Sequence, residues 1–271
     1  MEINRENINE IVFKSGLKPD KDYGQNYLVE PSICEKIISL LDIKHEDHVL
    51  EIGPGLGSLT HFLSLSNAKT IDLVDIDQRM IDFLKIIYNQ NNIHPILSDI
   101  RKHDVSCYDK IVGNLPYNIT TETILYLLKN AHSVKTLVLM CQTEAFDRFS
   151  NLDGKEYGPA SILVHLLGKV ERKLTVKPGS FYPAPKCSST VFIIQINENA
   201  DFSYCWNVYL LSKNLFLNRR KTIYNNLTNY LKDKDKAESL LNNLKIDARK
   251  RPEELSPQTY VDMYERIKVI S

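Results

Sequence analysis

Gly113-Asn114-Leu115-Pro116-Tyr117 is a segment whose residue types suit an amino group on a planar ring. The Asn114 side chain offers a carbonyl oxygen that accepts a hydrogen bond, and Pro116 biases Leu115 away from helical geometry, which turns the Leu115 carbonyl outward. Tyr117 supplies a flat face on which a nucleobase can stack, a contact worth ~1–3 kcal/mol. Asn and Pro are also common turn residues, so the segment alone fits an ordinary turn equally well.

A glycine-rich segment, Gly53-Pro54-Gly55-Leu56-Gly57, follows the apolar run His48–Ile52. Glycines let a cofactor approach the backbone at a strand-to-helix turn, as they also do in nicotinamide and flavin enzymes. Glu51 precedes the glycines and gives E-x-G-x-G-x-G in place of the dinucleotide pattern G-x-G-x-x-G. Because of this difference, and because an amino-group pocket implies transfer to nitrogen, we expect S-adenosylmethionine (SAM) as the cofactor, beside Gly53 and Gly55.

Two acidic residues follow further strand-like runs. Asp75 ends the run Ile71–Asp75, where a carboxylate is placed to bind ribose hydroxyls. Asp99 follows Pro95–Ser98 and could accept a hydrogen bond from an adenine amino group. Glycine or acidic residues at three successive strand ends make a chance arrangement improbable.

The elements that position these residues follow from the hydrophobic pattern. We expect a helix over residues 32–41, strands near 48–52, 70–75, 93–98, 110–113 and 136–141, a helix over 157–167, and strands over 170–176 and 189–196. From Asn197 onward the pattern is helical throughout. This predicts an α/β domain over residues 1–198 with a Rossmann-like, mixed but mostly parallel seven-stranded sheet, then a small all-α domain over residues 199–271, divided at Glu198 to Asp201.

Composition is typical of a globular protein, with 43% hydrophobic and 25% charged residues in a chain of 271. The five cysteines are scattered and form no C-x-x-C pair, so we expect neither disulfides nor a metal site. The N-terminus lacks an apolar signal core and no run of 18 apolar residues occurs. We therefore expect a cytoplasmic protein that does not enter membranes.

The net charge does not by itself indicate RNA binding. The 34 basic and 34 acidic residues cancel, whereas nucleic-acid binders are usually basic. Between Lys169 and Lys186 there are five basic residues and one acidic residue, and Arg219-Arg220-Lys221 forms a second cluster. Such clusters are more often solvated helix faces than RNA contacts. Because we expect these two clusters to flank the base pocket, we expect the following to contact RNA: Lys177, Lys186, Arg219, Arg220 and Lys221.

From Gly24 to Leu227 the chain resembles the KsgA-type ribosomal RNA small-subunit adenine dimethyltransferases. The resemblance rests on six segments in the family's order: Gly24-Gln25-Asn26-Tyr27-Leu28, Glu51-Ile52-Gly53-Pro54-Gly55-Leu56-Gly57, Gly113-Asn114-Leu115-Pro116-Tyr117-Asn118-Ile119, Tyr157-Gly158, Phe181-Tyr182-Pro183-Ala184-Pro185-Lys186 and Phe216-Leu217-Asn218-Arg219-Arg220-Lys221-Thr222. It implies methyl transfer from SAM to N6 of two adjacent adenosines near the 3′ end of small-subunit (16S) rRNA. It also implies the small ribosomal subunit as partner and a role in subunit biogenesis. We expect the enzyme to be a monomer.

The resemblance also implies a set of cofactor ligands: Asn26, Leu28, Gly53, Asp75, Asp99 and Asn114. The family more often has Glu where this chain has Asp75, and the shorter acid should still reach a ribose. Cys187 replaces a usual valine. Neither difference falls on the expected amino-group pocket.

The chemistry of adenine N6 suggests how the remaining residues act. Hydrogen bonds from N6–H to Asn114 Oδ1 and the Leu115 carbonyl would turn the nitrogen lone pair toward the methyl group and stabilise the positive charge that develops there. The target base must first be unstacked, and we expect Tyr117 and Phe181 to stack on it. This mechanism needs no metal and no covalent nucleophile.

Three alternatives stay open at this point. An erythromycin-resistance methyltransferase shares the cofactor and N-x-P-Y motifs but modifies large-subunit RNA, and the segments Phe181–Lys186 and Asn218–Thr222 favour the small-subunit enzyme over it. A ribosome-assembly factor could use the same chain chiefly for binding. A DNA or protein N-methyltransferase with an N-P-P-Y motif is the weakest match.

Overall fold

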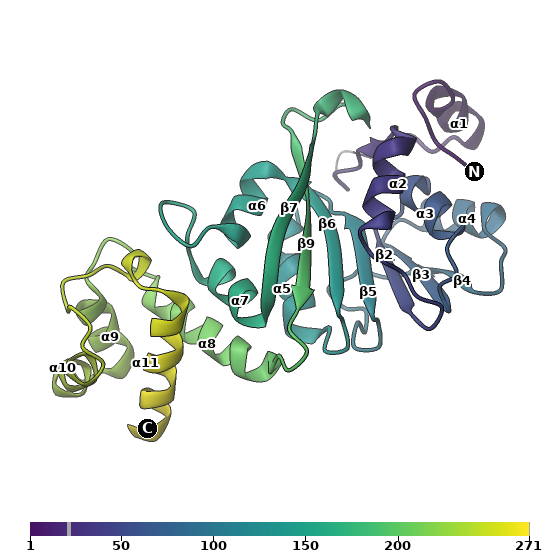
Figure 1. The fold of residues 1–271 in the computed structure, drawn as a ribbon. Coiled ribbons are helices and arrows are strands. Elements are labelled where there is room, and N and C mark those ends of the chain that lie inside the picture. Colours follow the sequence, from purple (N-terminus) through teal and green to yellow (C-terminus); the bar gives the residue numbers. More distant parts are fainter. Residues whose placement is uncertain (21–22, 271) are drawn as a thin grey trace. The chain divides into compact units, whose positions relative to one another are not determined.

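The computed structural model describes residues 1–20 and 23–270, and the chain divides into two compact units (Figure 1). Unit 1 comprises Met1–Phe146 and Val170–Glu198, and unit 2 comprises Asp147–Lys169 and Asn199–Ser271. The sequence pattern placed residues 147–169 in the catalytic domain, whereas here they belong to unit 2. The physical reason is burial, since Tyr157 and Ile162 are part of the hydrophobic core of that unit.

Unit 1 is built on a mixed sheet. Its strands lie in the order β4 (Ile93–Leu97), β3 (Thr70–Asp75), β2 (His48–Ile52), β5 (Lys110–Asn114), β6 (Thr136–Gln142), β9 (Ser189–Ile196) and β7 (Gly168–Val176). The first five are parallel to their neighbours, and β9 is antiparallel to β6. The mostly parallel seven-stranded sheet is therefore confirmed. Chain order reverses between β2 and β5, and ligands of open α/β sheets bind at such a point, beyond the carboxyl ends of the strands.

Helices α2 (Pro31–Ser39), α3 (Ser58–Leu63) and α4 (Gln78–Ile87) share a hydrophobic core with one face of the sheet (Figure 1). In that core Ile37, Leu63 and Leu84 pack with strand residues such as Ile71 and Leu73, and all of them are almost fully buried. The helices α5 (Thr120–Asn130) and α6 (Thr143–Ser150) follow β5 and β6. Strands buried on both faces explain the continuous apolar runs in the sequence.

The N-terminal segment adds elements that the sequence pattern did not predict. Helix α1 (Ile8–Ser15) buries Ile8 and Val12 in a cluster with Leu56 of the glycine-rich turn and Met80 of α4. Strand β1 (Tyr27–Leu28) pairs antiparallel with β8 (Phe181–Tyr182), which follows the 3₁₀ turn η1 (Pro178–Ser180). This short ladder holds the residues just before β1 beside the carboxyl ends of the parallel strands.

In the described part of unit 2 the regular elements are helices, apart from the first residues of β7. Its elements are α7 (Pro159–Leu167), α8 (Phe202–Leu215), α9 (Ile223–Leu231), α10 (Lys234–Asn243), the turn η2 (Pro252–Glu254) and α11 (Pro257–Ile270). Two buried tyrosines link its core to its backbone, since the Tyr157 hydroxyl donates to the Leu255 carbonyl at 2.7 Å and the Tyr260 hydroxyl donates to the Pro252 carbonyl at 2.7 Å.

None of the five cysteines forms a disulfide; Cys34, Cys141 and Cys205 are buried, and Cys107 and Cys187 are exposed. Among the described residues no group of three or more His, Cys, Asp or Glu side chains is placed to hold a metal ion. The helices of this part of the chain include none that is long and apolar enough to span a bilayer.

Candidate active site

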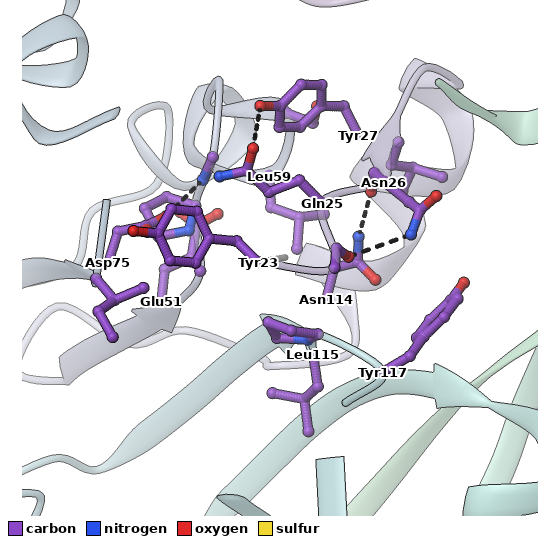
Figure 2. Close-up of a pocket in the computed structure, with 18 residues that line it drawn as sticks. Tyr23, Gln25, Asn26, Tyr27, Glu51, Leu59, Asp75, Asn114, Leu115 and Tyr117 are labelled. Carbon is purple, nitrogen blue, oxygen red and sulfur yellow. Dashed lines mark hydrogen bonds between the residues drawn. The ribbon is translucent and has the colours of Figure 1, made fainter. Parts of the chain in front are cut away.

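A pocket lies in unit 1 where the loops after β2, β3 and β5 meet the segment before β1 (Figure 2). In Figure 2, Asp75 and Glu51 lie at one side of the view and Asn114 and Tyr117 at the other. Its wall includes eight residues that the sequence singled out: Asn26, Leu28, Gly53, Gly55, Asp75, Asn114, Leu115 and Tyr117. Three strand ends and the segment before β1 therefore converge on one site.

A second pocket adjoins the first and contains Asp99 in its wall. The two pockets share Gly53, Asp75 and Ile76, so they form one continuous cleft. Ile76 was not anticipated, although it directly follows the strand-end acid, and its side chain is 49% exposed. An exposed apolar side chain beside two carboxylates is suited to pack against a planar ring whose edge is polar.

The Asn114 side chain has a defined orientation. Its Nδ2 donates a hydrogen bond to the backbone carbonyl of Asn26 at 2.9 Å. A carbonyl oxygen can only accept, so the NH2 end of the amide must face Asn26, and Oδ1 points the other way. The site therefore holds an acceptor oxygen in a fixed direction, which is what an amino-group pocket requires.

Leu115 and Tyr117 are anchored on either side of Pro116. The Leu115 side chain is buried and its backbone N–H donates to the Met140 carbonyl at 2.9 Å, which continues the β5–β6 pairing. The half-buried Tyr117 hydroxyl lies 2.9 Å from the Ser189 hydroxyl on β9, and burial raises the pKa of the phenol. The ring is thus held at its hydroxyl end while it lines the pocket.

Phe181 differs from the sequence expectation. Its side chain is only 4% exposed and packs in the core cluster with Leu28 and Val176. The cause is the β1–β8 ladder, in which Phe181 pairs with Leu28 and is directed inward. In this structure the ring has no exposed face for a base, so Tyr117 is the aromatic residue of the pair that lines the site.

Asp75 lies at the end of β3 and is buried, with 8% of the residue exposed. Oδ2 accepts from the Gly55 N–H at 3.2 Å and Oδ1 accepts from the Asp77 N–H at 2.9 Å. Burial raises the pKa of Asp75, and these hydrogen bonds oppose that effect. Each carboxylate oxygen can accept more than one hydrogen bond, so hydroxyl groups in the cleft can still be bound.

Asp99 is paired with Arg101, which the sequence analysis did not identify. Nε of Arg101 donates to Oδ1 at 3.0 Å and Nη2 donates to Oδ2 at 2.8 Å. These bonds lower the pKa of Asp99, so its carboxylate stays ionised in the wall of the cleft. Because Oδ2 receives only the Arg101 bond among the hydrogen bonds described, it is the oxygen better placed to accept from a ligand.

Glu51 is the most deeply buried acid of the pocket wall, at 1% exposure. Its Oε2 accepts from the Thr60 hydroxyl of α3 at 2.7 Å. Burial raises the pKa of this carboxyl to about 8, and the nearby Asp75 carboxylate acts in the same direction. A positively charged ligand would favour the ionised form and would find its counter-charge here.

The glycines of the turn after β2 have different neighbours. Gly53 and Gly55 both adopt left-handed conformations, with φ of 63° and 54°. A Cβ on Gly55 would lie 2.9 Å from Cε1 of Tyr27, so a side chain there collides with the protein before it meets any cofactor. A Cβ on Gly53 would have no heavy atom nearer than 3.9 Å and would instead occupy the cleft. Gly53 is therefore the glycine that leaves room for a ligand.

The five basic residues expected at RNA lie outside this cleft. Lys177 and Lys186 are exposed in unit 1, and Arg220 and Lys221 are exposed in unit 2. Arg219 has a structural role, because its guanidinium donates to the Gly154 carbonyl at 2.7 Å and to the Lys155 carbonyl and lies 3.5 Å from Glu253. It therefore supports the turn after α8, and its neighbours present free charge to solvent.

Comparison with known proteins identifies the family. The family model described as ribosomal RNA adenine dimethylase matches residues 16–269. The chain belongs to this family. The resemblance inferred from the sequence motifs is therefore confirmed over nearly the whole chain, and the Asn114 pocket is that of a family of RNA-modifying enzymes.

Curated relatives and solved structures agree with this assignment. The ribosomal RNA small subunit methyltransferase A of Malacoplasma penetrans is 35% identical over 89% of each chain, and that of Lactobacillus johnsonii is 36% identical over 95% of this chain and 94% of the relative. A dimethyladenosine transferase from Plasmodium falciparum superposes with a TM-score of 0.78 at 28% identity, covering 89% of this chain and 97% of the other. The 23S rRNA methyltransferase ErmE, at 20% identity and a TM-score of 0.68 over 90% and 100%, shows the shared fold. The Rossmann-like methyltransferase fold of this dimethylase is thereby confirmed.

Proposed function

We propose that this dimethylase transfers methyl groups from SAM to N6 of two adjacent adenosines near the 3′ end of 16S rRNA, giving N6,N6-dimethyladenosine during small-subunit biogenesis. The names of its relatives, which act on the small subunit, support this substrate. The observation that carries the chemistry is the Asn114 amide, whose oxygen is fixed as an acceptor beside the Tyr117 ring. The proposed partner is the small ribosomal subunit, met in the cytoplasm by a monomer.

The cleft fits SAM in its shape and in the hydrogen-bonding groups that line it. Gly53 leaves open the space that a Cβ would fill, Asp75 offers acceptors for ribose hydroxyls, and Asp99 with Ile76 suits an adenine ring and its amino group. Asn26 and Leu28 also line the pocket. When bound, SAM supplies an electrophilic methyl group on a positively charged sulfur.

The residues of the pocket are placed to make adenine N6 a better nucleophile. The lone pair of adenine N6 is delocalised into the ring, so the amino group reacts poorly. Asn114 Oδ1 and the Leu115 carbonyl accept its N–H groups, turn the lone pair out of the ring plane and stabilise positive charge as it develops on nitrogen. Unstacking the base costs a few kcal/mol, which stacking on Tyr117 partly offsets. Each transfer would break the sulfur–methyl bond, leave S-adenosylhomocysteine and release one proton from the nitrogen. One N–H then remains after the first transfer, so one acceptor suffices for the second.

The raised pKa of Glu51 leads to a pH-dependent affinity for the cationic cofactor. Because the folded-state pKa is about 8, the carboxyl is mostly protonated at lower pH and must ionise to face a cation. SAM affinity, measured by calorimetry, is expected to rise by up to about tenfold per pH unit below that pKa and to level off above it. The Glu51→Gln variant should show weaker binding and no such slope. An equal slope in both proteins would contradict this role.

The Tyr117 ring is expected to contribute more to turnover than the Tyr117 hydroxyl does. Tyr117→Phe keeps the ring and loses one hydrogen bond to Ser189, worth about 0.5–1.5 kcal/mol, so at least about a tenth of the turnover should remain. Tyr117→Ala removes a stacking face worth about 1–3 kcal/mol and should lower turnover on 30S subunits roughly 5–150-fold. Ser189→Ala is the matched control and should resemble the Phe variant. Equal losses for Phe and Ala would show that stacking is not what the ring provides.

Arg220 and Lys221 are expected to contact phosphates, whereas Arg219 supports the turn that carries them. Each phosphate contact contributes about −0.7 to −0.9 to the slope of log affinity against log salt, so the Arg220→Gln/Lys221→Gln pair should flatten the slope for 30S binding by roughly 1.4 to 1.8. Arg219→Gln should chiefly lower the thermal midpoint. If the pair variant folds and keeps the original slope, RNA docking is better assigned to Lys177 and Lys186.

Incubation with radiolabelled SAM tests the substrate class. Unmethylated 30S subunits, 50S subunits and DNA are supplied in parallel, and label is expected only in 30S rRNA. Label in 50S rRNA would favour the large-subunit enzyme, and label in DNA would favour a DNA methyltransferase. Tight 30S binding without transfer would favour an assembly factor that has lost catalysis.

A further inference from the structure

Residues 23–28, here called the strap, contact the Asn114 side chain, which is proposed to orient the reacting amino group. The Asn26 carbonyl of the strap receives the Asn114 Nδ2 hydrogen bond across 88 positions of the sequence. Without this contact an asparagine amide could rotate by half a turn and present its NH2 group where an acceptor is needed. The strap therefore decides which end of Asn114 faces the pocket.

Gln25 uses both ends of its side chain to hold the strap in place. Its Oε1 accepts from the Tyr27 hydroxyl at 3.0 Å and from the Asp20 N–H at 2.9 Å. Its Nε2 donates to Asp77 Oδ2 at 3.2 Å. On the other side of Asn26, Leu28 is paired with Phe181 in the β1–β8 ladder. The Asn26 carbonyl is thus fixed from both directions along the chain.

The anchor of Gln25 is itself rigid and belongs to the cofactor side of the cleft. Asp77 caps helix α4 by accepting from the Arg79 N–H at 3.0 Å, and the Arg79 guanidinium lies 2.6 Å from its Oδ2. The backbone N–H of Asp77 donates to Asp75 Oδ1 at 2.9 Å. Hydrogen bonds therefore link Asp75 to Asp77 and Asp77 to Gln25 of the strap, and a further hydrogen bond links Asn26 of the strap to Asn114.

We propose that the strap is a positioning element for methyl transfer, in which the Asn26 carbonyl orients the Asn114 amide and Gln25 holds that carbonyl in place. The proposal rests on the proposed function, in which Asn114 Oδ1 accepts from the reacting amino group. It explains why position 114 needs an amide. An ionised carboxylate there would set a negative oxygen against the Asn26 carbonyl, and only a protonated carboxyl could donate to it.

The Asn114→Asp variant tests the proposal with two readouts. In the free protein, carbon-13 NMR should place the pKa of the introduced carboxyl well above its ordinary value of about 3.9. Transfer to 30S subunits at saturating SAM, expressed relative to the unaltered enzyme at each pH between about 5.5 and about 8.5, should fall as pH rises, because the protonated group alone reproduces the amide. Burial alone could raise that pKa, but activity would then follow the ionised acceptor and rise with pH. A rise with pH, or an ordinary pKa, overturns the proposal.

Two further variants separate the effect of the Asn26 contact from the general effect of adding a carboxyl group. Asn89→Asp adds the same charge at an exposed asparagine that lines neither pocket, and its carboxyl should titrate near the ordinary value. Adding Gln25→Leu to Asn114→Asp should release the strap and bring the raised pKa down by at least about one unit. An unchanged pKa in that folded double variant overturns the role of Gln25. The NMR titrations need no substrate, so their outcome is independent of whether the proposed function holds.

Discussion

Replacing Asn114 with alanine is expected to lower turnover on 30S subunits by about 10²–10³-fold, the typical cost of removing one oriented group that stabilises developing charge. The reason is geometric, since the Asn26 carbonyl fixes the amide so that Oδ1 is the acceptor left to the pocket. Binding of 30S subunits should be nearly unchanged, because Asn114 lies in the cleft and the basic residues lie elsewhere.

The experiment compares turnover at saturating SAM with separate measurements of SAM and 30S affinity. Asn89→Ala, at an exposed asparagine that lines neither pocket, is the matched control. A rate loss accompanied by an equal loss of 30S affinity would assign Asn114 to substrate binding. Turnover close to that of the unaltered enzyme would remove the basis of the mechanism.

Asp75→Asn is expected to weaken SAM binding by about 10²-fold although the two side chains have nearly the same shape. The two carboxylate oxygens each accept from a backbone N–H, one from Gly55 and one from Asp77. An amide has a single acceptor end, so one of these N–H groups would face an NH2 group, and the charge that binds ribose hydroxyls would also be lost.

Asp75→Glu is the matched control, because it keeps both oxygens and the charge, and it should retain SAM affinity to within about tenfold. Calorimetry gives the affinities, and thermal unfolding shows whether each variant is folded. A folded Asp75→Asn protein that binds SAM normally would show that this acid does not hold the cofactor.

Strand ends were the most predictable part of the site. Glycines and acids after buried runs mark the carboxyl edge of a parallel sheet, so the sequence alone predicts that Gly53, Asp75, Asp99 and Asn114 share one cleft. The periodicity that defines such strands is local and depends on burial on both faces. This also explains why the bounds of β2, β3 and β9 agree with the expected ranges.

Contacts between distant segments could not be predicted in the same way. The Gln25–Asp77 and Asn26–Asn114 hydrogen bonds join residues 52 and 88 positions apart, and neither polar residue type nor spacing indicates such a partner. Arg219 shows the same difficulty, since its partners are mainly backbone carbonyls of a loop. A cluster of charges in a sequence does not reveal which member is already bound.

Phe181 and the segment 147–169 show why burial direction is hard to infer. Strand β8 has two residues, too few for alternation to indicate which side chain points inward, and the inward one is Phe181. Residues 159–167 form a helix as expected, but helical periodicity does not specify which core the apolar face joins. Here Ile162 joins the core of unit 2.

Mass spectrometry of 16S rRNA tests the central claim most directly. Unmethylated 30S subunits are incubated with SAM and either the enzyme or its Asn114→Ala variant, and the rRNA is digested to fragments whose modified nucleosides are located. The account predicts N6,N6-dimethyladenosine at two adjacent positions near the 3′ end with the unaltered enzyme, and almost none with the variant. Methyl groups at any other base or atom, or equal dimethylation by the two proteins, would contradict it.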